Sequence, residues 1–270
     1  MKTRIRSALI LLPVLFLTAW VLPKIVAAVI VGAMGAIASY ELLVSVGYVR
    51  HKRLMIYCSV AAFLVSIWSH MGANQTWGTL GLMAFVALLF GEMMFNHVKV
   101  RFEKLCICLM AGIWMPYLLT AVIRIFGTYL GRYTIGIPFL LAFLPDSGAY
   151  FAGRFFGRHK LAPVISPNKT VEGALGGLLA GVVGMLLYAA ILDIAFDRMV
   201  SYPLALLYGF LGAGADIFGD LMFSAIKRQT GIKDYGNLIP GHGGILDRFD
   251  SVIMVAPLME VLLILLPVVK

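Results

Sequence analysis

The feature that most constrains this chain is a series of apolar stretches, each about as long as a membrane is thick. A helix that crosses the hydrocarbon core needs about 20 predominantly apolar residues. The sequence contains about nine such stretches, and charged residues make up only 13% of its 270 positions. We therefore predict an all-α, polytopic integral membrane protein with about nine transmembrane helices. The expected helices cover residues 7–22, 25–46, 54–72, 77–95, 105–126, 135–153, 173–194, 203–226 and 251–269.

Two of these stretches allow a second interpretation. The basic residues ahead of 7–22 also fit a signal peptide, but another apolar stretch follows at once and no clear cleavage site separates the two. We expect an uncleaved first helix. The sixth stretch contains Pro138, Pro145 and Asp146, so we expect it to be broken or partly re-entrant.

The basic residues fall mainly on one side of the expected helices. Cytoplasmic loops carry more Lys and Arg than loops on the other side. When loops are assigned to alternate sides, most of the 22 Lys and Arg residues lie on the side of the N-terminus. We therefore expect a cytoplasmic N-terminus in the inner membrane. The net charge of +9 is explained by anionic lipid headgroups and implies no nucleic-acid partner.

The acidic residues are distributed unevenly along the chain. All eight aspartates lie at or after position 146, and the first 134 residues hold only three glutamates. We predict that residues 1–134 form an N-terminal scaffold of about five transmembrane helices and that residues 135–270 form the catalytic portion. Two cytoplasmic polar loops are expected in that portion, at about 154–172 and 227–250.

One face of the eighth apolar stretch is polar. Gly212, Asp216, Asp220 and Ser224 follow one another at four-residue intervals, and Lys227 lies near the same face one turn later. A charged side chain within a membrane helix costs roughly 2.5–3.5 kcal/mol, so it is expected to have a partner or a function. Either aspartate could pair with a basic residue to join two helices, but a functional role is the default interpretation.

Two more carboxylates, Asp247 and Asp250, lie at the start of the last apolar stretch. Helix capping alone would explain Asp250, because negative charge is favourable in a first helical turn. It explains Asp247 less well, because that residue lies in a crowded polar loop. Two pairs of carboxylates at helix ends suit a hard cation such as Mg²⁺, which prefers oxygen ligands.

The loop before these acids is rich in glycine and flanked by basic residues. Gly243 and Gly244, next to His242, would allow backbone amides to approach anionic oxygens closely. His242 alone would more often be an ordinary loop residue. No P-loop or dinucleotide-binding motif is present. Together with the nearby basic residues, the loop is typical of a polyphosphate site. These basic residues are Lys227, Arg228, Lys233 and Arg248.

A second polar segment precedes the seventh apolar stretch. Asp146, Tyr150, Arg154 and Arg158 are spaced by four, so they would align if the segment were helical. With Lys169, the two arginines could bind a substrate. They could equally be ordinary basic residues of a cytoplasmic loop.

The start of the seventh stretch has the pattern of a capped and closely packed helix. Thr170 is a natural N-cap residue. Gly173, Gly177 and Gly181 follow at four-residue intervals, a pattern that favours close helix packing in membranes.

The segment SAIKRQTGIKDYGNLIPGHGGILDRFD, residues 224–250, resembles the hallmark of phosphatidate cytidylyltransferases, also called CDP-diacylglycerol synthases. The segment from 145 to 173 is also similar to that family, whereas the first five helices match it only in hydropathy. The fixed positions of the hallmark are all present: Ser224, Lys227, Arg228, Lys233, Asp234, Pro240, His242, Gly243, Gly244, Asp247, Arg248 and Asp250.

The resemblance implies a Mg²⁺-dependent membrane enzyme that condenses CTP with phosphatidate, giving CDP-diacylglycerol and pyrophosphate at the cytoplasmic surface. It also implies that Asp220 and Asp247 bind metal, with Asp216, Asp250 and Asp146 as further candidates. The expected catalytic residues are Asp220, Asp247, Lys227, Arg228 and His242. The expected substrate-binding residues are Lys233, Arg248, Gly243, Gly244, Ser224, Arg154, Arg158 and Lys169.

Two other functions fit part of the pattern. A CTP-dependent polyprenol kinase would need a base for a neutral hydroxyl, and His242 or an aspartate could serve. An ion transporter could use the acids of the eighth stretch as a relay, although the polar residues gather on one side only. The sequence leaves open whether a second cation binds and whether the protein forms a homodimer.

Overall fold

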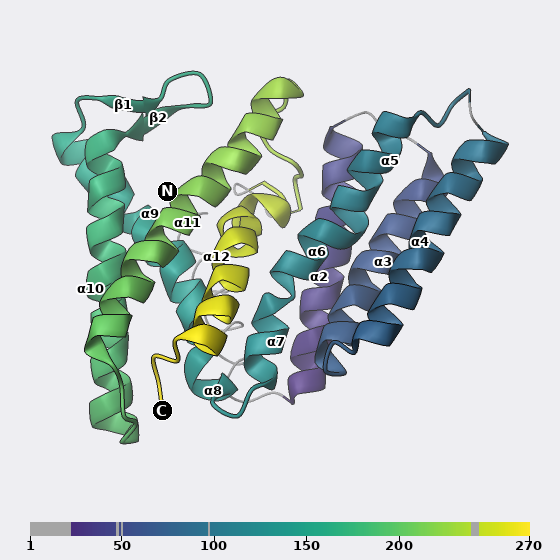
Figure 1. Cartoon of the computed structure of the whole chain (residues 1–270). Helices are drawn as coiled ribbons and strands as arrows, with labels where there is room; N and C mark the ends of the chain where they lie inside the picture. The colour runs from purple at the N-terminus through teal and green to yellow at the C-terminus, as the bar shows by residue number, and fades with distance from the viewer. Residues whose placement is uncertain (1–22, 47–48, 50, 97, 239–242) are drawn as a thin grey trace. The chain divides into compact units, whose positions relative to one another are not determined.

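The computed structural model describes residues 23–46, 49, 51–96, 98–238 and 243–270, and it is almost wholly helical (Figure 1). In these residues, seven helical segments are long and apolar enough to cross a membrane. The predicted all-α integral membrane fold is therefore confirmed. The expected helix at 7–22 lies outside the described residues, so the count of nine stays a prediction. The seven segments are Lys24–Ser45, Lys52–His70, Gln75–Phe95, Phe102–Gly127, Gly131–Phe156, Val171–Phe196 and Tyr202–Gln229.

The chain packs as two compact units. The first extends to Gly127 and also includes the loop Thr230–Phe249, and the second comprises Thr128–Gln229 and Asp250–Lys270. The predicted division at 134/135 concerns function and stays a prediction. By packing alone, the polar loop that precedes the last helix belongs with the N-terminal helices.

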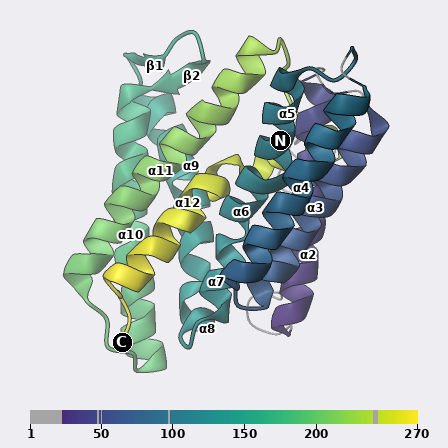
Figure 2. The ribbon, with the colours of Figure 1, turned by 45° about the vertical axis from the view of Figure 1, so that its right-hand side comes forward.

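The first unit is built around α2 (Lys24–Ser45) and α3 (Lys52–His70), which pack against each other along their length. Helix α4 (Gln75–Phe95) lies beside α3 and is followed by a segment that combines several short helices (Figure 2). That segment comprises α5 (Phe102–Leu109), η1 (Met110–Trp114), α6 (Met115–Leu119) and α7 (Ala121–Gly127).

The π-helical turn η1 interrupts this fifth membrane segment. Pro116, the second residue of α6, has no N–H group to donate to the preceding turn, which favours a local change of helical register. Gly112 lies within the π-turn, where an added Cβ atom would be 2.6 Å from the Phe85 ring. The absence of a side chain at Gly112 therefore allows Phe85 of α4 to pack closely at this point.

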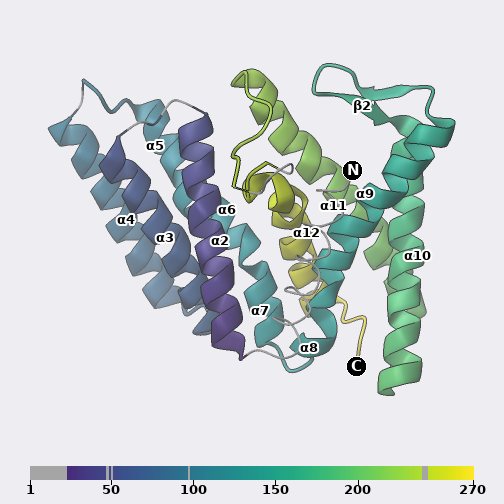
Figure 3. The ribbon, with the colours of Figure 1, turned by 180° about the vertical axis from the view of Figure 1, so that it is seen from behind.

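The second unit contains α8 (Gly131–Thr134), α9 (Gly136–Phe156), α10 (Val171–Phe196) and α11 (Tyr202–Gln229). Figures 1 and 3 show α10 beside both α9 and α11. The expected break in the sixth segment is wrong, because α9 runs through Pro145 as one helix. Proline is tolerated within membrane helices because neighbouring groups can satisfy the freed carbonyl.

The last long helix, α12 (Leu246–Leu265), covers most of the ninth expected stretch. It is not among the seven segments that meet the length and hydropathy criteria for crossing a membrane. The helix begins in the polar loop of the first unit and continues in the second. Asp247 and Asp250 therefore lie within its first turns.

Glycines produce the close packing of α10, as the sequence predicted. The Thr170 hydroxyl accepts a hydrogen bond from the Gly173 amide at 3.1 Å and caps the helix. A Cβ atom on Gly177 would lie 3.0 Å from the Pro145 carbonyl oxygen of α9. One on Gly181 would lie 2.7 Å from the Ala213 Cβ of α11. The stripe therefore brings α9 and α11 against the same helix.

We expect Gly181→Ala to lower the thermal unfolding midpoint of the detergent-purified protein, because the new methyl group overlaps α11. Overpacking of this kind costs about 1–3 kcal/mol. Gly214→Ala is the matched control, because a Cβ atom there meets nothing within 4 Å. Its midpoint should be unchanged or higher, since alanine favours helix. Equal midpoints for the two variants would contradict the packing described here.

Candidate functional site

The polar face predicted on the eighth apolar stretch is present on α11. Asp216 is 1% exposed, and its Oδ1 atom has no hydrogen-bond partner among the described residues. Asp220 accepts a hydrogen bond from the Ser224 hydroxyl at 3.2 Å and forms an ion pair with Lys169. The face therefore carries one carboxylate that is paired and one that has an unused buried oxygen.

Four aspartates of the second unit share one electrostatic neighbourhood, which we call the acidic cluster: Asp146, Asp216, Asp220 and Asp250. The charges of Asp146 and Asp220 act on both Asp216 and Asp250. They are opposed by Lys169 at Asp216 and by Lys227 at Asp250. Four carboxyl groups and two lysines therefore lie in one neighbourhood.

A β-hairpin carries Lys169 to α11. Strand β1 (Lys160–Ala162) pairs antiparallel with β2 (Ser166–Thr170), in a segment where the sequence predicted a polar loop. The Arg228 Nε group at the end of α11 donates to the Ile165 carbonyl at 3.1 Å. The hairpin is therefore attached to α11 both by this hydrogen bond and by the ion pair between Lys169 and Asp220.

The base of the hairpin is held by Glu172, which was not among the predicted residues. Its carboxylate accepts hydrogen bonds from the backbone N–H of Arg158 at 3.0 Å and of His159 at 3.2 Å. The His159 Nδ1 atom lies 2.6 Å from the same carboxylate. Glu172 therefore joins the first turn of α10 to the chain that leaves α9. A glutamate after an N-cap residue was the only sequence signal for it.

The predicted alignment along α9 is confirmed in part. Arg154 donates to the Tyr150 hydroxyl at 2.9 Å, as expected for residues one helical turn apart. Arg158 does not continue this row, because α9 ends at Phe156 and the Gly157 backbone is extended. The expected alignment of Arg158 with Asp146 is therefore wrong. Both arginine side chains are exposed.

Asp247 organises the loop of the first unit. Its Oδ2 atom accepts hydrogen bonds from the Tyr235 N–H at 2.7 Å and the Gly244 N–H at 3.0 Å. Gly243 has a φ of +84°, and an added Cβ atom would lie 2.8 Å from the same oxygen. Asp247 therefore holds a residue that lies 12 positions before it, a role that the sequence did not predict.

The Gly244 amide is thus already engaged, although the sequence predicted that it would face a phosphate. His242 lies outside the described residues, so its predicted role is not addressed by the structure. Asp247 belongs to the first unit and Asp220 to the second, and their predicted convergence on one cation stays a prediction.

The predicted phosphate-binding cations differ in exposure. Lys227 is 9% exposed, and its charge acts on Asp250. Arg228, Lys233 and Arg248 are exposed. Ser224 is buried and bonded to Asp220, so its hydroxyl helps to hold that carboxylate.

Sequence reasoning missed Glu41 of α2. Its side chain is 6% exposed and accepts hydrogen bonds from the Ile245 N–H at 3.0 Å and the Leu246 N–H at 2.9 Å. The only signal was an acid within an apolar stretch, which is expected to have a partner. That partner could not be identified from the sequence, because the bonded residues are 204 and 205 positions apart.

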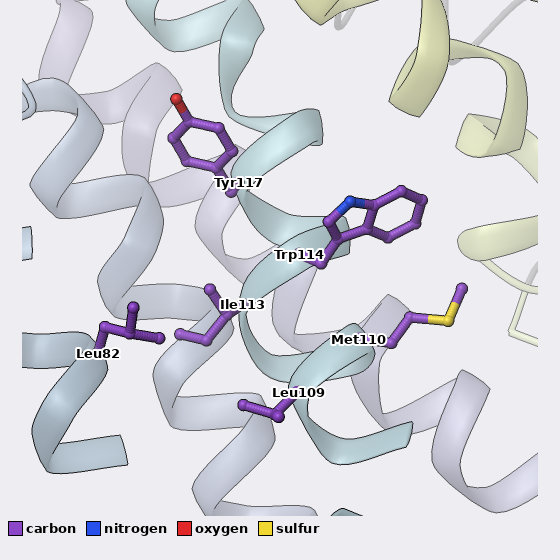
Figure 4. A pocket seen from close by; sticks show the side chains of 6 residues that line it. All are labelled: Leu82, Leu109, Met110, Ile113, Trp114 and Tyr117. Carbon is purple, nitrogen blue, oxygen red and sulfur yellow. The ribbon is translucent and has the colours of Figure 1, made fainter. Parts of the chain in front are cut away.

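An open apolar pocket of about 500 Å³ lies on the first unit (Figure 4). No Asp, Glu, Lys, Arg or His is among the described residues that line it, so it offers no charge to bind a polyphosphate. Its lining residues are Leu82, Leu109, Met110, Ile113, Trp114 and Tyr117.

The acidic cluster fits a hard divalent cation in its chemistry. In the described part of the chain, no three His, Cys, Asp or Glu side chains are arranged to hold one metal ion. Mg²⁺, however, is usually bound by one or two carboxylates, with waters and substrate phosphates completing its coordination. The buried, unpartnered Oδ1 of Asp216 is the kind of ligand that such a site would use. The residues therefore fit Mg²⁺ shared with a phosphate-bearing substrate.

We expect Gly243→Ala to loosen the loop, because the methyl group would overlap the Asp247 carboxylate and alanine is strained at this φ. Hydrogen exchange of the Tyr235 amide should become faster. Gly231→Ala is the control, because Gly231 has a φ of +70° but an added Cβ atom meets nothing within 4 Å. If both variants changed exchange at Tyr235 equally, backbone strain alone would account for the effect, and Asp247 would not hold the loop.

Comparison with known proteins identifies the family of this chain. The model of the family described as "Cytidylyltransferase family" matches residues 2–266. The chain is similar to proteins from several staphylococci that are named phosphatidate cytidylyltransferase. The protein from Staphylococcus epidermidis is 37% identical over 182 residues, which is 67% of each chain. The protein from Staphylococcus haemolyticus is 33% identical over 212 residues, which is 77% of this chain and 78% of the relative.

A third relative, from Staphylococcus saprophyticus, is 38% identical over 187 residues, or 68% of each chain. The family match covers nearly the whole sequence, including all the helices of both units. It also covers every residue of the acidic cluster and of the loop that Asp247 organises. The chain therefore belongs to the cytidylyltransferase family.

Proposed function

We propose that this protein transfers the cytidylyl group of CTP to phosphatidate, giving CDP-diacylglycerol and pyrophosphate for phospholipid synthesis. Membership of the cytidylyltransferase family and the names of its relatives support the reaction. The structural observation that carries the proposal is the acidic cluster on α9, α11 and α12, in contact with basic residues of a hairpin and of α11.

The reaction needs little acid–base chemistry from the protein. The phosphate of phosphatidate is already ionised at neutral pH, so it can attack the α-phosphorus of CTP without a strong general base. The bond from that phosphorus to the leaving pyrophosphate then breaks. The main obstacle is the repulsion between two polyanions, and positioning and electrostatics supply most of the catalysis in such reactions.

A divalent cation, Mg²⁺ in this proposal, would neutralise phosphate oxygens and stabilise the pyrophosphate as it leaves. We assign Asp220 and Asp247 as its principal ligands, with Asp216, Asp250 and Asp146 as the other candidates. The gathering of four carboxyl groups in the acidic cluster and the unpartnered Asp216 oxygen support the assignment of its members. Whether a second cation binds is left open.

Basic residues would hold the substrate phosphates. Lys169 is already attached to Asp220, so a small movement of its side chain would bring it to a phosphate at the same site. The other proposed phosphate-binding residues are Lys227, Arg228, Lys233 and Arg248. We assign the exposed Arg154 and Arg158, at the end of α9, to the lipid headgroup or to a share of the nucleotide.

We further propose that the site faces the cytoplasm, where CTP is available. The excess of Lys and Arg in loops on the side of the predicted site supports this orientation. The acyl chains of phosphatidate would remain in the bilayer while the headgroup reaches the polar helix ends.

Product analysis tests the reaction. Purified protein in detergent, incubated with radiolabelled CTP, phosphatidate and MgCl₂, should give labelled CDP-diacylglycerol and release pyrophosphate, and EDTA should stop the reaction. Formation of CDP in place of pyrophosphate would identify a kinase instead. Ion flux across vesicles in the absence of CTP would favour a transporter.

We expect Asp216→Asn and Asp220→Asn each to lower the rate of lipid labelling by at least about 100-fold, because each replaces a carboxylate ligand of the proposed cation by a neutral amide. Asp197→Asn is the control. Asp197 is exposed at the end of α10 with a φ of +51°, which asparagine adopts readily. Near-normal activity in both cluster variants, with the proteins folded, would show that the cluster does not hold the catalytic cation.

A further inference from the structure

We propose that Glu41 is a positioning residue for the loop before α12, although it lies in the predicted N-terminal scaffold. Its carboxylate would hold the loop in the conformation that places Asp247 for its proposed role. The link to catalysis rests on the proposed function, whereas the link to loop structure does not. Both Glu41 and the loop belong to the first unit.

The contact between Glu41 and the start of α12 is bidentate. Oε1 of Glu41 accepts the Ile245 N–H at 3.0 Å, and Oε2 accepts the Leu246 N–H at 2.9 Å. These amides lie at the start of α12, where N–H groups have no partner within the helix. Glu41 therefore acts as an N-cap supplied by another helix, in the position where a negative charge is most favourable.

The glycines of the loop allow this approach. An added Cβ atom on Gly236 would lie 2.5 Å from Oε1 of Glu41. One on Gly244 would overlap both carboxylate oxygens. The loop backbone thus closes around Glu41 from two sides, and only residues without a side chain fit there.

Two carboxylates together fix the loop. Glu41 holds the amides of Ile245 and Leu246, and Asp247 holds those of Tyr235 and Gly244. Asp247 is itself a residue of α12, and it directly follows Leu246, whose amide Glu41 binds. Loss of Glu41 would therefore release the helix start that carries Asp247, and it would leave buried amides without a partner.

Glu41→Gln tests this role, because it keeps the size of the side chain but places an amide N–H₂ group where an acceptor is needed. We expect hydrogen exchange in residues 235–246 to become roughly 10- to 100-fold faster, as loss of charge-assisted hydrogen bonds implies. With CTP and phosphatidate as substrates, kcat should fall by at least about tenfold while the KM for phosphatidate changes less, since chemistry and not lipid access depends on the loop.

Glu92→Gln is the matched control. Glu92 is also a buried glutamate of a membrane helix in the first unit, 7% exposed, and it accepts a hydrogen bond from Asn96 at 2.9 Å. Its substitution should leave exchange in residues 235–246 unchanged, even if the protein becomes less stable. Gly244→Ala disturbs the same contact, because the added methyl group would overlap the Glu41 carboxylate. It should reproduce the faster exchange, so the test stands even if Glu41→Gln fails to fold.

Unchanged exchange in residues 235–246 of Glu41→Gln would overturn the proposal. So would an equal effect of Glu92→Gln, which would indicate a general loss of stability. If wild-type protein made no CDP-diacylglycerol, the proposed function would fail, but the exchange result would still decide whether Glu41 holds the loop. If exchange increased while kcat stayed unchanged, Glu41 would be structural and the positioning role would be rejected.

Discussion

The structure depends on how carboxylates are accommodated in a chain of apolar helices. A buried charge is costly unless other groups compensate it. The described residues provide three solutions. Glu41 is compensated by backbone amides at a helix start, Asp247 by amides of its own loop, and Asp220 by Lys169. Asp216 keeps one buried oxygen for which the described residues supply no hydrogen-bond partner. Glu41 and Asp247 hold the loop, whereas Asp216, on the same helix face as Asp220, offers a buried oxygen to a ligand.

The sequence predicted features that depend on residues close together along the chain. Hydropathy predicted the membrane helices, and a four-residue spacing predicted the polar face of α11 and the glycine face of α10. The Thr170 cap and the Arg154–Tyr150 contact follow from one turn of helix. The hallmark motif indicated the family, which the comparisons then showed.

The remaining features depend on contacts between distant segments or on local exceptions to a rule. The partner of Glu41 lies more than 200 positions away, so the first half of the chain was predicted as scaffold only. Pro145 was expected to break a helix that neighbouring helices keep intact. The hairpin at 160–170 is short and polar, and its attachment to α11 could not be predicted without knowing which helices are neighbours. The amide contacts of Asp247 depend on a loop conformation that only glycine permits.

The central claim is that the aspartates of the acidic cluster hold a divalent cation in concert with the phosphates of CTP. Electron paramagnetic resonance of Mn²⁺ added to the detergent-purified protein measures this directly, without any turnover. The account predicts that Mn²⁺ binds more tightly when CTP is present, and that replacing Asp216 and Asp220 together by asparagine weakens this binding by at least about tenfold. Equal Mn²⁺ affinity in the wild type and the double variant, with CTP present, would contradict it.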